Sequence, residues 1–245
     1  MMHPPHWPAG IEESPIGLKA GRGRRPLGSF LTAACAAFLT LLFLTNAALC
    51  ADENSDSLPR IIFTKEFPHS QPDYYSISVH EDGQTVYRTA PDDDSPLGFQ
   101  LPLETAQEIF SIALKLNRFR DRNLESSHRV AFMGKKTLAY QKGQEHYESV
   151  FNFTEVPEAL ALTALFERIS QTEQHLLRLK YLIRFDRLGV EKELLQLEVN
   201  LDQGRLLGAA QLAPLLEQIQ NNRSLVHIAQ TRAAQILGKI HSGKD

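Results

Sequence analysis

Residues 157–188, PEALALTALFERISQTEQHLLRLKYLIRFDRL, decide how the rest of the sequence is interpreted. Apolar residues recur there at alternating spacings of three and four, with a single polar member, Thr172. This spacing is typical of a heptad repeat on one long helix, which we expect to end at Gly189, a residue that favours helix termination. The apolar stripe consists of Leu162, Leu165, Ile169, Thr172, Leu176, Leu179 and Ile183.

The apolar stripe has two alternative uses. It can pack within the chain against the second or the fourth helix of the C-terminal part, or it can join a second copy or a protein partner, as in a coiled coil. Further helices are expected at 190–201, at 215–220 after Pro214, and up to residue 240 from a cap at Asn222 or Ser224.

Upstream of this helix the periodicity changes to that of β-strands. Residues 60–67 and 74–80 predict strands, the second with Tyr75, Ile77 and Val79 on one face. Asp82-Gly83 then predicts a hairpin with a type I′ turn, in which both central residues have positive φ, followed by a strand at 85–87.

A helix and a second group of strands lie between this hairpin and the long helix. An acidic turn at 91–96 precedes a helical period over residues 103–119. Residues 129–133, 137–141 and 145–153 predict a three-stranded meander. The fold class is therefore α+β, with an α+β part at 60–155 and a helical part at 156–245. We expect the long helix to start against the sheet and to end within the helical part.

The N-terminal residues have the layout of an export signal. Residues 1–29 form a basic region, residues 30–51 (FLTAACAAFLTLLFLTNAALCA) form an uncharged apolar run, and residues 52–59 form a polar spacer. Cleavage after Ala51 would release a periplasmic or secreted protein. The alternative is an uncleaved inner-membrane anchor, because the run is about long enough to span a bilayer, roughly 20 residues, with the domain still outside the cytoplasm.

Composition excludes several classes of function. Both cysteines, Cys35 and Cys50, lie in the signal, so the mature chain has no disulfide, no thiol catalysis and no cysteine-ligated metal. From residue 52 onward the chain has 22 basic and 27 acidic residues, a net charge of −5. Such a charge is not that of a nucleic-acid-binding protein.

Residues 72–87, PDYYSISVHEDGQTVY, resemble a hairpin of uncharacterised exported bacterial domains. Their pattern is Pro-x-Tyr, an alternating strand, Asp-Gly and Val-x-Tyr, often followed by a helix like 103–119. The resemblance covers residues 60–120 and implies an exported bacterial protein, but no catalytic residue. Members of that group often carry cysteines just before the proline, and residues 67–71 here have none.

The candidate site residues are His80, His128, His146 and Glu148. On a strand His146 and Glu148 would share a face, where the two other histidines could join them in a metal or acid–base site. The alternative is a solvated polar face. No two histidines have the local spacing of a zinc site, and Asp92-Asp93-Asp94 lacks the alternating ligands of a calcium loop. We therefore expect no metal and no cofactor.

These observations favour an exported bacterial module with a binding or structural role in the cell envelope. The alternative is a small hydrolase or metal-dependent enzyme with its site on the meander at 129–153. Clustering of the candidate residues in one cleft would favour the enzyme, and their separation would favour the module.

Overall fold

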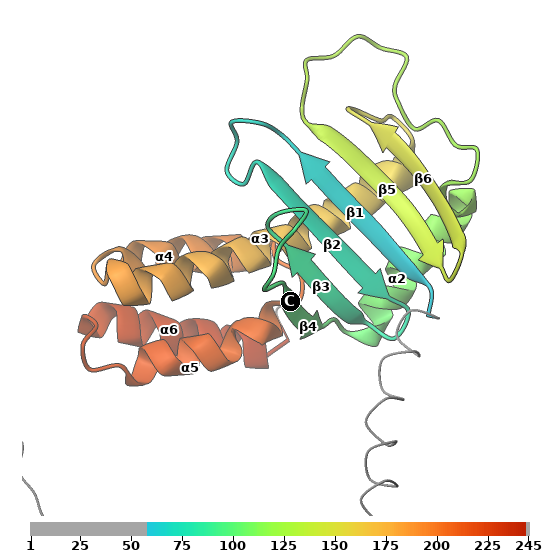
Figure 1. Ribbon diagram of the computed structural model, residues 1–245. Coiled ribbons are helices and arrows are strands. Elements are labelled where there is room, and N and C mark those ends of the chain that lie inside the picture. Colours follow the sequence, from blue (N-terminus) through green and yellow to red (C-terminus); the bar gives the residue numbers. More distant parts are fainter. Residues whose placement is uncertain (1–57, 244–245) are drawn as a thin grey trace, which may run out of the picture. The chain divides into compact units, whose positions relative to one another are not determined.

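The computed structural model describes residues 58–243. They belong to one compact unit. A six-stranded antiparallel sheet carries helices on one face, and a group of helices follows at the C-terminal end (Figure 1). This arrangement confirms the α+β fold class.

The sheet combines a meander with a hairpin. Its strands are β1 (Arg60–Glu66), β2 (Tyr74–His80), β3 (Gln84–Arg88), β4 (Leu97–Gln100), β5 (Lys135–Lys142) and β6 (Glu145–Phe151). Their order is β4-β3-β2-β1-β5-β6, and every neighbouring pair is antiparallel. The first four strands follow the chain, and α2 (Leu103–Lys115) then returns the chain to the far side of β1.

The two faces of the sheet differ in their cover. Phe63 pairs with Ile77 on β2 and with Leu138 on β5, and all three side chains are buried. Helices α2 and α3 lie on this face, behind the sheet in Figure 1, and leave the opposite face without helical cover. Alternation along each strand therefore places one set of side chains in the core and the other on an open face.

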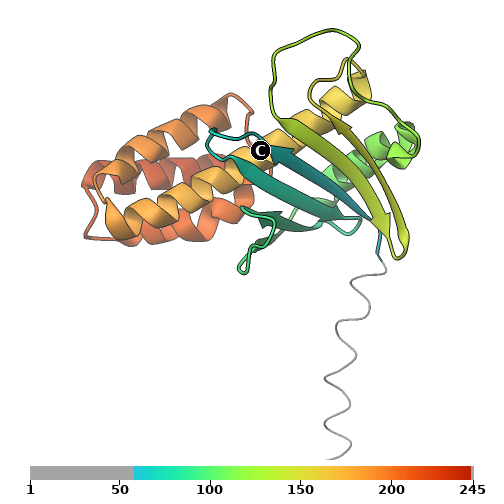
Figure 2. The ribbon, with the colours of Figure 1, turned by 45° about the horizontal axis from the view of Figure 1, so that its top comes forward.

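The helical part follows directly on the last strand. It consists of α3 (Pro157–Phe185), α4 (Gly189–Asp202), the short helix η2 (Ala209–Leu212), α5 (Ala213–Asn221) and α6 (His227–His241). Figure 2 shows α3 passing beneath the sheet and then continuing beside the other helices. As expected from the sequence, α3 begins against the sheet and ends in the helical part.

Both halves of α3 are buried, each in a different hydrophobic core. Leu162 and Ile169 belong to the core beneath the sheet, whereas Leu176 and Leu179 belong to the core formed with α4, α5 and α6. Thr172 lies between the two cores, fully buried, and its hydroxyl is 3.0 Å from the backbone oxygen of Leu207. The apolar stripe thus packs within the chain. Its use by a second chain stays a prediction, for which the same side chains would have to be exposed.

The strand predicted at 129–133 is wrong. These residues form a loop, in which the backbone N–H of Met133 donates to Oδ1 of Asn152 and the amide of Asn152 donates to the oxygen of Ala131. In a meander such a strand would lie beside β5, but β1 and β6 already pair with β5 on its two sides. Because β1 occupies the place beside β5, residues 129–133 cannot pair there as a strand, although their sequence has the period of a strand.

Two turns also differ from their predictions. The hairpin after His80 has three residues, and only Gly83 has a positive φ, 87°. Its N–H donates to the oxygen of His80, so this is a three-residue loop and not a type I′ turn. Gly189 begins α4 and does not end α3. A Cβ at this position would lie 2.8 Å from Oδ2 of Asp186, so a larger residue would require the Asp186 side chain to move.

The ends of several helices and strands also differ from the predicted ones. Strand β4 was not anticipated, because four residues that include a glycine have little periodicity. Helix α2 ends at Lys115, and Phe119 reaches the core through the short helix η1 (Asn117–Phe119) with a positive φ. Helix α6 begins at His227, after a turn in which Oδ1 of Asn222 accepts from the N–H of Ser224.

Other sequence predictions lie outside the described residues. These are the export signal at 1–51 with both of its cysteines, and most of the spacer at 52–59. Within residues 58–243, no helix has the length and hydropathy required to span a bilayer.

Shortening a side chain of the second core tests the role of α3. Leu179→Ala removes a fully buried side chain, and we expect a loss of about 2–5 kcal/mol in the free energy of unfolding, measured in denaturant. Leu195→Ala on α4 is the matched control, because that side chain is 44% exposed, and should change stability by less than about 0.5 kcal/mol. Equal effects of the two substitutions would contradict the described packing.

Candidate functional site

The sequence-predicted site residues do not converge. His80 and His146 occupy the same row of the open sheet face, but Arg60 on β1 and Gln141 on β5 stand between them. Three strand spacings separate them, about 14 Å. His146 and Glu148 do meet, with Nε2 3.5 Å from Oε2, and both are exposed. This pair alone is an ordinary surface contact.

His128 lies on the loop beside β6 and makes a separate cluster with Ser126 and Glu155. Its Nδ1 is 2.9 Å from Oε2 of Glu155, and the hydroxyl of Ser126 donates to the same oxygen at 2.9 Å. These contacts lower the pKa of Glu155. A hydrolytic triad requires the serine to donate to the histidine, but here both groups bind one exposed carboxylate. The cluster therefore does not activate the serine.

A metal site is likewise not formed by the described side chains. Among residues 58–243, no three His, Cys, Asp or Glu side chains lie close enough together to hold a metal ion. Asp93 of the acidic turn instead closes its own loop, accepting from the backbone N–H groups of Thr89 and Ser95.

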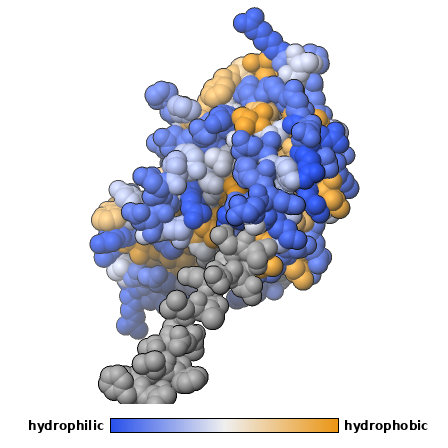
Figure 3. All heavy atoms as spheres, turned by 45° about the vertical axis from the view of Figure 1, so that its right-hand side comes forward, coloured by the Kyte–Doolittle hydropathy of each residue, from blue (hydrophilic) through white to orange (hydrophobic). Residues whose placement is uncertain are grey.

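Figure 3 shows that one side of the molecule is mainly hydrophilic, interrupted by separate hydrophobic residues.

A groove runs along α3, at the junction of the sheet and the helical part. Two cavities of about 570 and 310 Å³ adjoin there. They share Gln71 and Pro72 on the loop between β1 and β2, and Gln171 and Gln174 on α3. We call this feature the α3 groove. Its remaining lining includes Lys65, Tyr75, Tyr87, Glu167, His175, Arg178, Tyr181, Glu193 and Gln196.

Two buried tyrosines lie at the sheet side of the α3 groove. The rings of Tyr75 and Tyr87 stack with centroids 6.0 Å apart. Burial raises the pKa of Tyr75, and the negative charge of Glu167 raises it further. Burial raises the pKa of Tyr87 to about 12. Both phenols therefore stay protonated at neutral pH, and neither acts as a base.

His175 is held by hydrogen bonds on both ring nitrogens. Nδ1 is 2.6 Å from Oε1 of Glu193, and Nε2 is 2.9 Å from the amide nitrogen of Asn200. Gln196 donates to Oδ1 of Asn200 and so directs the Asn200 amide nitrogen toward the ring. The ring proton then lies on Nδ1, and Nε2 accepts from Asn200. Neither nitrogen is left to accept a proton from a nucleophile.

The two walls of the α3 groove offer amide groups that the protein does not use. Gln71 and Gln171 make no side-chain hydrogen bond to another described residue, whereas Gln174 donates to Ser170 at 2.9 Å. The loop that carries Gln71 is closed by Ser70, whose hydroxyl lies 2.6 Å from the backbone oxygens of Phe67 and Pro72. The groove can therefore both donate to and accept from a polar ligand.

A buried carboxyl lies on the other side of α3. Glu173 is fully buried, and neither of its carboxylate oxygens has a hydrogen-bond partner within residues 58–243. Burial raises its pKa from 4.5 to about 7, while the amide of Gln211 and the charge of Lys180 oppose the shift. Between about pH 4.5 and pH 7 the folded protein therefore holds a proton on Glu173 that the unfolded chain releases.

Sequence reasoning missed the α3 groove. Its residues come from positions as far apart as Gln71, Gln171 and Glu193, and glutamine is common on any helix surface. One signal was present, because Ser170, Thr172, Glu173 and His175 place polar groups at the middle of a helix that is apolar on both sides. All four are buried.

The Glu173 carboxyl predicts a stability that depends on pH. Because the folded pKa of Glu173 lies above its unfolded value, the contribution of this carboxyl to stability should be complete below pH 4.5 and be lost by about pH 7, a fall of roughly 3 kcal/mol. Glu173→Gln should remove this fall and be more stable than wild type at about pH 8. Denaturant unfolding across this range measures it. The exposed Glu217→Gln serves as control and should keep the wild-type slope, and an unchanged slope in Glu173→Gln would contradict the assignment.

Comparison with known proteins adds no functional constraint. No protein-family model matches the sequence, and no curated protein matches it significantly. The resemblance of residues 60–120 to a hairpin of exported bacterial domains therefore stays a prediction.

Proposed function

We propose that the protein is an exported bacterial module of the cell envelope that binds an extended, polar peptide segment in the α3 groove. The observation that carries this proposal is the pair of unused amides, Gln71 and Gln171, on opposite walls. A side-chain amide has one donor group and one acceptor group, as a peptide unit has. Two such amides facing one groove could each form hydrogen bonds with a peptide unit of a bound chain.

The dimensions of the α3 groove support an extended ligand. Its lining on α3 runs from Glu167 to Tyr181, which is roughly 21 Å at the helical rise per residue. An extended chain advances about 3.3 Å per residue. A segment of about six residues would therefore span the groove.

The balance of positive and negative side chains in the α3 groove supports a ligand without a net charge. Nζ of Lys65 is 2.8 Å from Oε1 of Glu167, and His175 is bound to Glu193. The guanidinium of Arg178 lies 6.0 Å from the ring centroid of Tyr181. The lining holds two cations, Lys65 and Arg178, and two carboxylates, Glu167 and Glu193. Because these charges are equal in number, hydrogen bonding and contact with the aromatic ring would dominate recognition.

The chemistry of the groove favours binding over catalysis. Both nitrogens of His175 are engaged, and the phenols of Tyr75 and Tyr87 stay protonated. No contact among the described residues favours the alternative hydrolase or metal-dependent enzyme on residues 129–153. Location outside the cytoplasm is inferred from the sequence of residues 1–51 alone.

Export is tested by the mass of the protein recovered from the periplasm or the medium. We expect the mature chain to begin near Asp52, because the uncharged run ends at Ala51. Intact-mass measurement identifies the N-terminus. A chain that keeps Met1 and fractionates with the membrane would support the anchor, and a chain found only in the cytoplasm would contradict export.

Peptide binding is tested with a displayed library of random peptides selected on the wild-type protein. Selected peptides should lose about 3- to 10-fold in affinity for Gln71→Ala and again for Gln171→Ala, because each variant loses a hydrogen bond. Gln107→Ala, an exposed amide on α2, is the matched control and should bind like wild type. Failure to select any peptide, or peptides indifferent to both groove variants, would contradict the proposal.

A further inference from the structure

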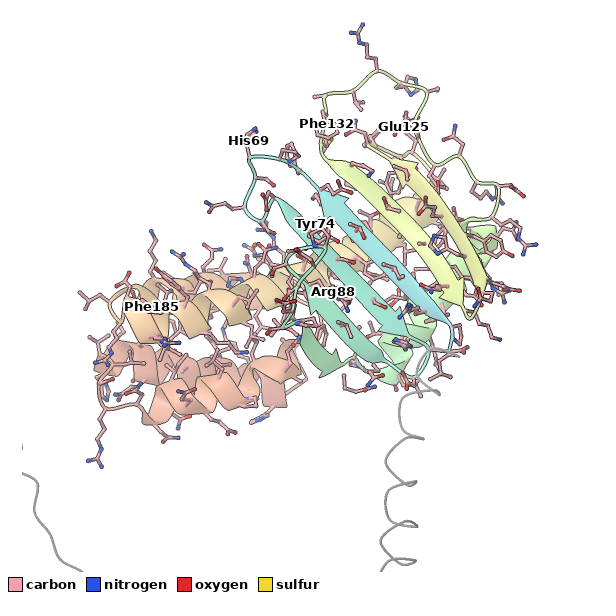
Figure 4. All side chains as sticks on the ribbon, viewed as in Figure 1. His69, Tyr74, Arg88, Glu125, Phe132 and Phe185 are labelled. Carbon is pink, nitrogen blue, oxygen red and sulfur yellow. The ribbon has the colours of Figure 1, made fainter. Side chains whose placement is uncertain are left out.

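The end of the helical part farthest from the sheet carries an unusual surface. Helix α4 returns toward the sheet, α5 leads away from it and α6 returns again, so the α3–α4 and α5–α6 connections lie at one end (Figures 1 and 2). Figure 4 shows Phe185 at this end of α3. We call this surface the distal tip and define it by Tyr181, Arg184, Phe185, Arg187, Leu188, Arg223, Val226 and Ile228.

The distal tip exposes large apolar side chains. Leu188 is 80% exposed and Phe185 is 64% exposed, and Val226 and Ile228 of the second connection are exposed as well. The rings of Tyr181 and Phe185 lie against each other, 4.9 Å apart. Polar residues would serve equally well in a turn that only has to reverse the chain. Large apolar side chains exposed at both connections of one end indicate an interaction surface.

The charge of the distal tip is opposite to that of the rest of the domain. The two connecting segments, residues 181–188 and 222–228, contain three arginines (Arg184, Arg187 and Arg223) and one acidic residue, Asp186. Their net charge is therefore +2. From residue 52 onward the chain as a whole has a net charge of −5. A net positive charge therefore coincides with exposed apolar side chains at this end of the molecule.

Two acidic groups near the distal tip, Asp186 and Glu191, already have partners within the protein. Oδ1 of Asp186 accepts from the N–H of Gly189 at 3.2 Å, and Oε1 of Glu191 is 3.3 Å from Arg232. In contrast, the three tip arginines make no ion pair with any residue in 58–243. The guanidinium of Arg184 lies 5.2 Å from the Phe185 ring, which keeps cation and apolar group together.

We propose that the distal tip docks onto an anionic lipid surface. Phe185, Leu188 and Ile228 would enter the interfacial region, where apolar and aromatic side chains are stabilised. The arginines would lie among the lipid phosphates, each strengthening binding to a negatively charged surface. The charge favours lipid phosphate over a neutral surface.

A tryptophan reporter at the distal tip tests this docking in the full chain. The sequence has one tryptophan, Trp7, so Leu188→Trp is made together with Trp7→Phe. We expect its emission to shift to the blue with vesicles that contain phosphatidylglycerol and to be quenched by brominated lipid. Pure phosphatidylcholine vesicles should give a much smaller shift. Val150→Trp, at an exposed position on β6, is the control for insertion of residues 30–51 and should not respond.

Charge variants separate the distal tip from other membrane contacts. Arg184→Gln and Arg187→Gln should each weaken the reporter's vesicle affinity about five-fold, and Arg129→Gln, an exposed arginine of the β6-side loop, should leave it unchanged. Any of three results would overturn the proposal. The reporter could fail to respond, it could respond equally to neutral vesicles, or both tip variants could keep the wild-type affinity. A blue shift that grows with protein concentration in the absence of vesicles would overturn it in favour of a second copy.

Discussion

The structure depends on the burial of one helix in two hydrophobic cores. The first half of α3 packs Leu162, Phe166 and Ile169 beneath the sheet, and its second half packs Leu176 and Leu179 against the other helices. Each fully buried leucine or isoleucine contributes roughly 1.5–3 kcal/mol. Because α3 is one continuous helix across the junction, unfolding of its part in one core would disturb its packing in the other core.

The same continuity explains where the polar residues lie. At the middle of α3 the helix leaves the sheet before it is fully enclosed by its neighbours, and Ser170, Thr172, Glu173 and His175 occupy this junction. Thr172 and His175 find partners on the chain that follows, at Leu207, Glu193 and Asn200. The α3 groove opens beside these residues, so the proposed binding site is a consequence of the way in which the two cores are joined.

Sequence periodicity predicted most elements because it reports which face of a segment is buried. The apolar stripe of α3 and the alternation of β2 were recognised in this way. Periodicity does not report which strand pairs with which. Residues 129–133 have a strand pattern but lie in a loop, because β1 takes the place beside β5. His80 and His146 are separated for the same reason, since β1 and β5 lie between their strands. The groove amides carry no sequence motif, and only the fold brings Gln71 to α3.

The most direct measurement is whether the two cores unfold together. Five of the six tyrosines belong to the sheet part and only Tyr181 belongs to the helical part, so near-ultraviolet circular dichroism reports mainly on the sheet. Far-ultraviolet ellipticity reports mainly on the helices. Shared burial of α3 predicts that both signals change in one coincident transition during thermal or denaturant unfolding. Two separate transitions, with helical signal retained after the tyrosine signal is lost, would contradict the account.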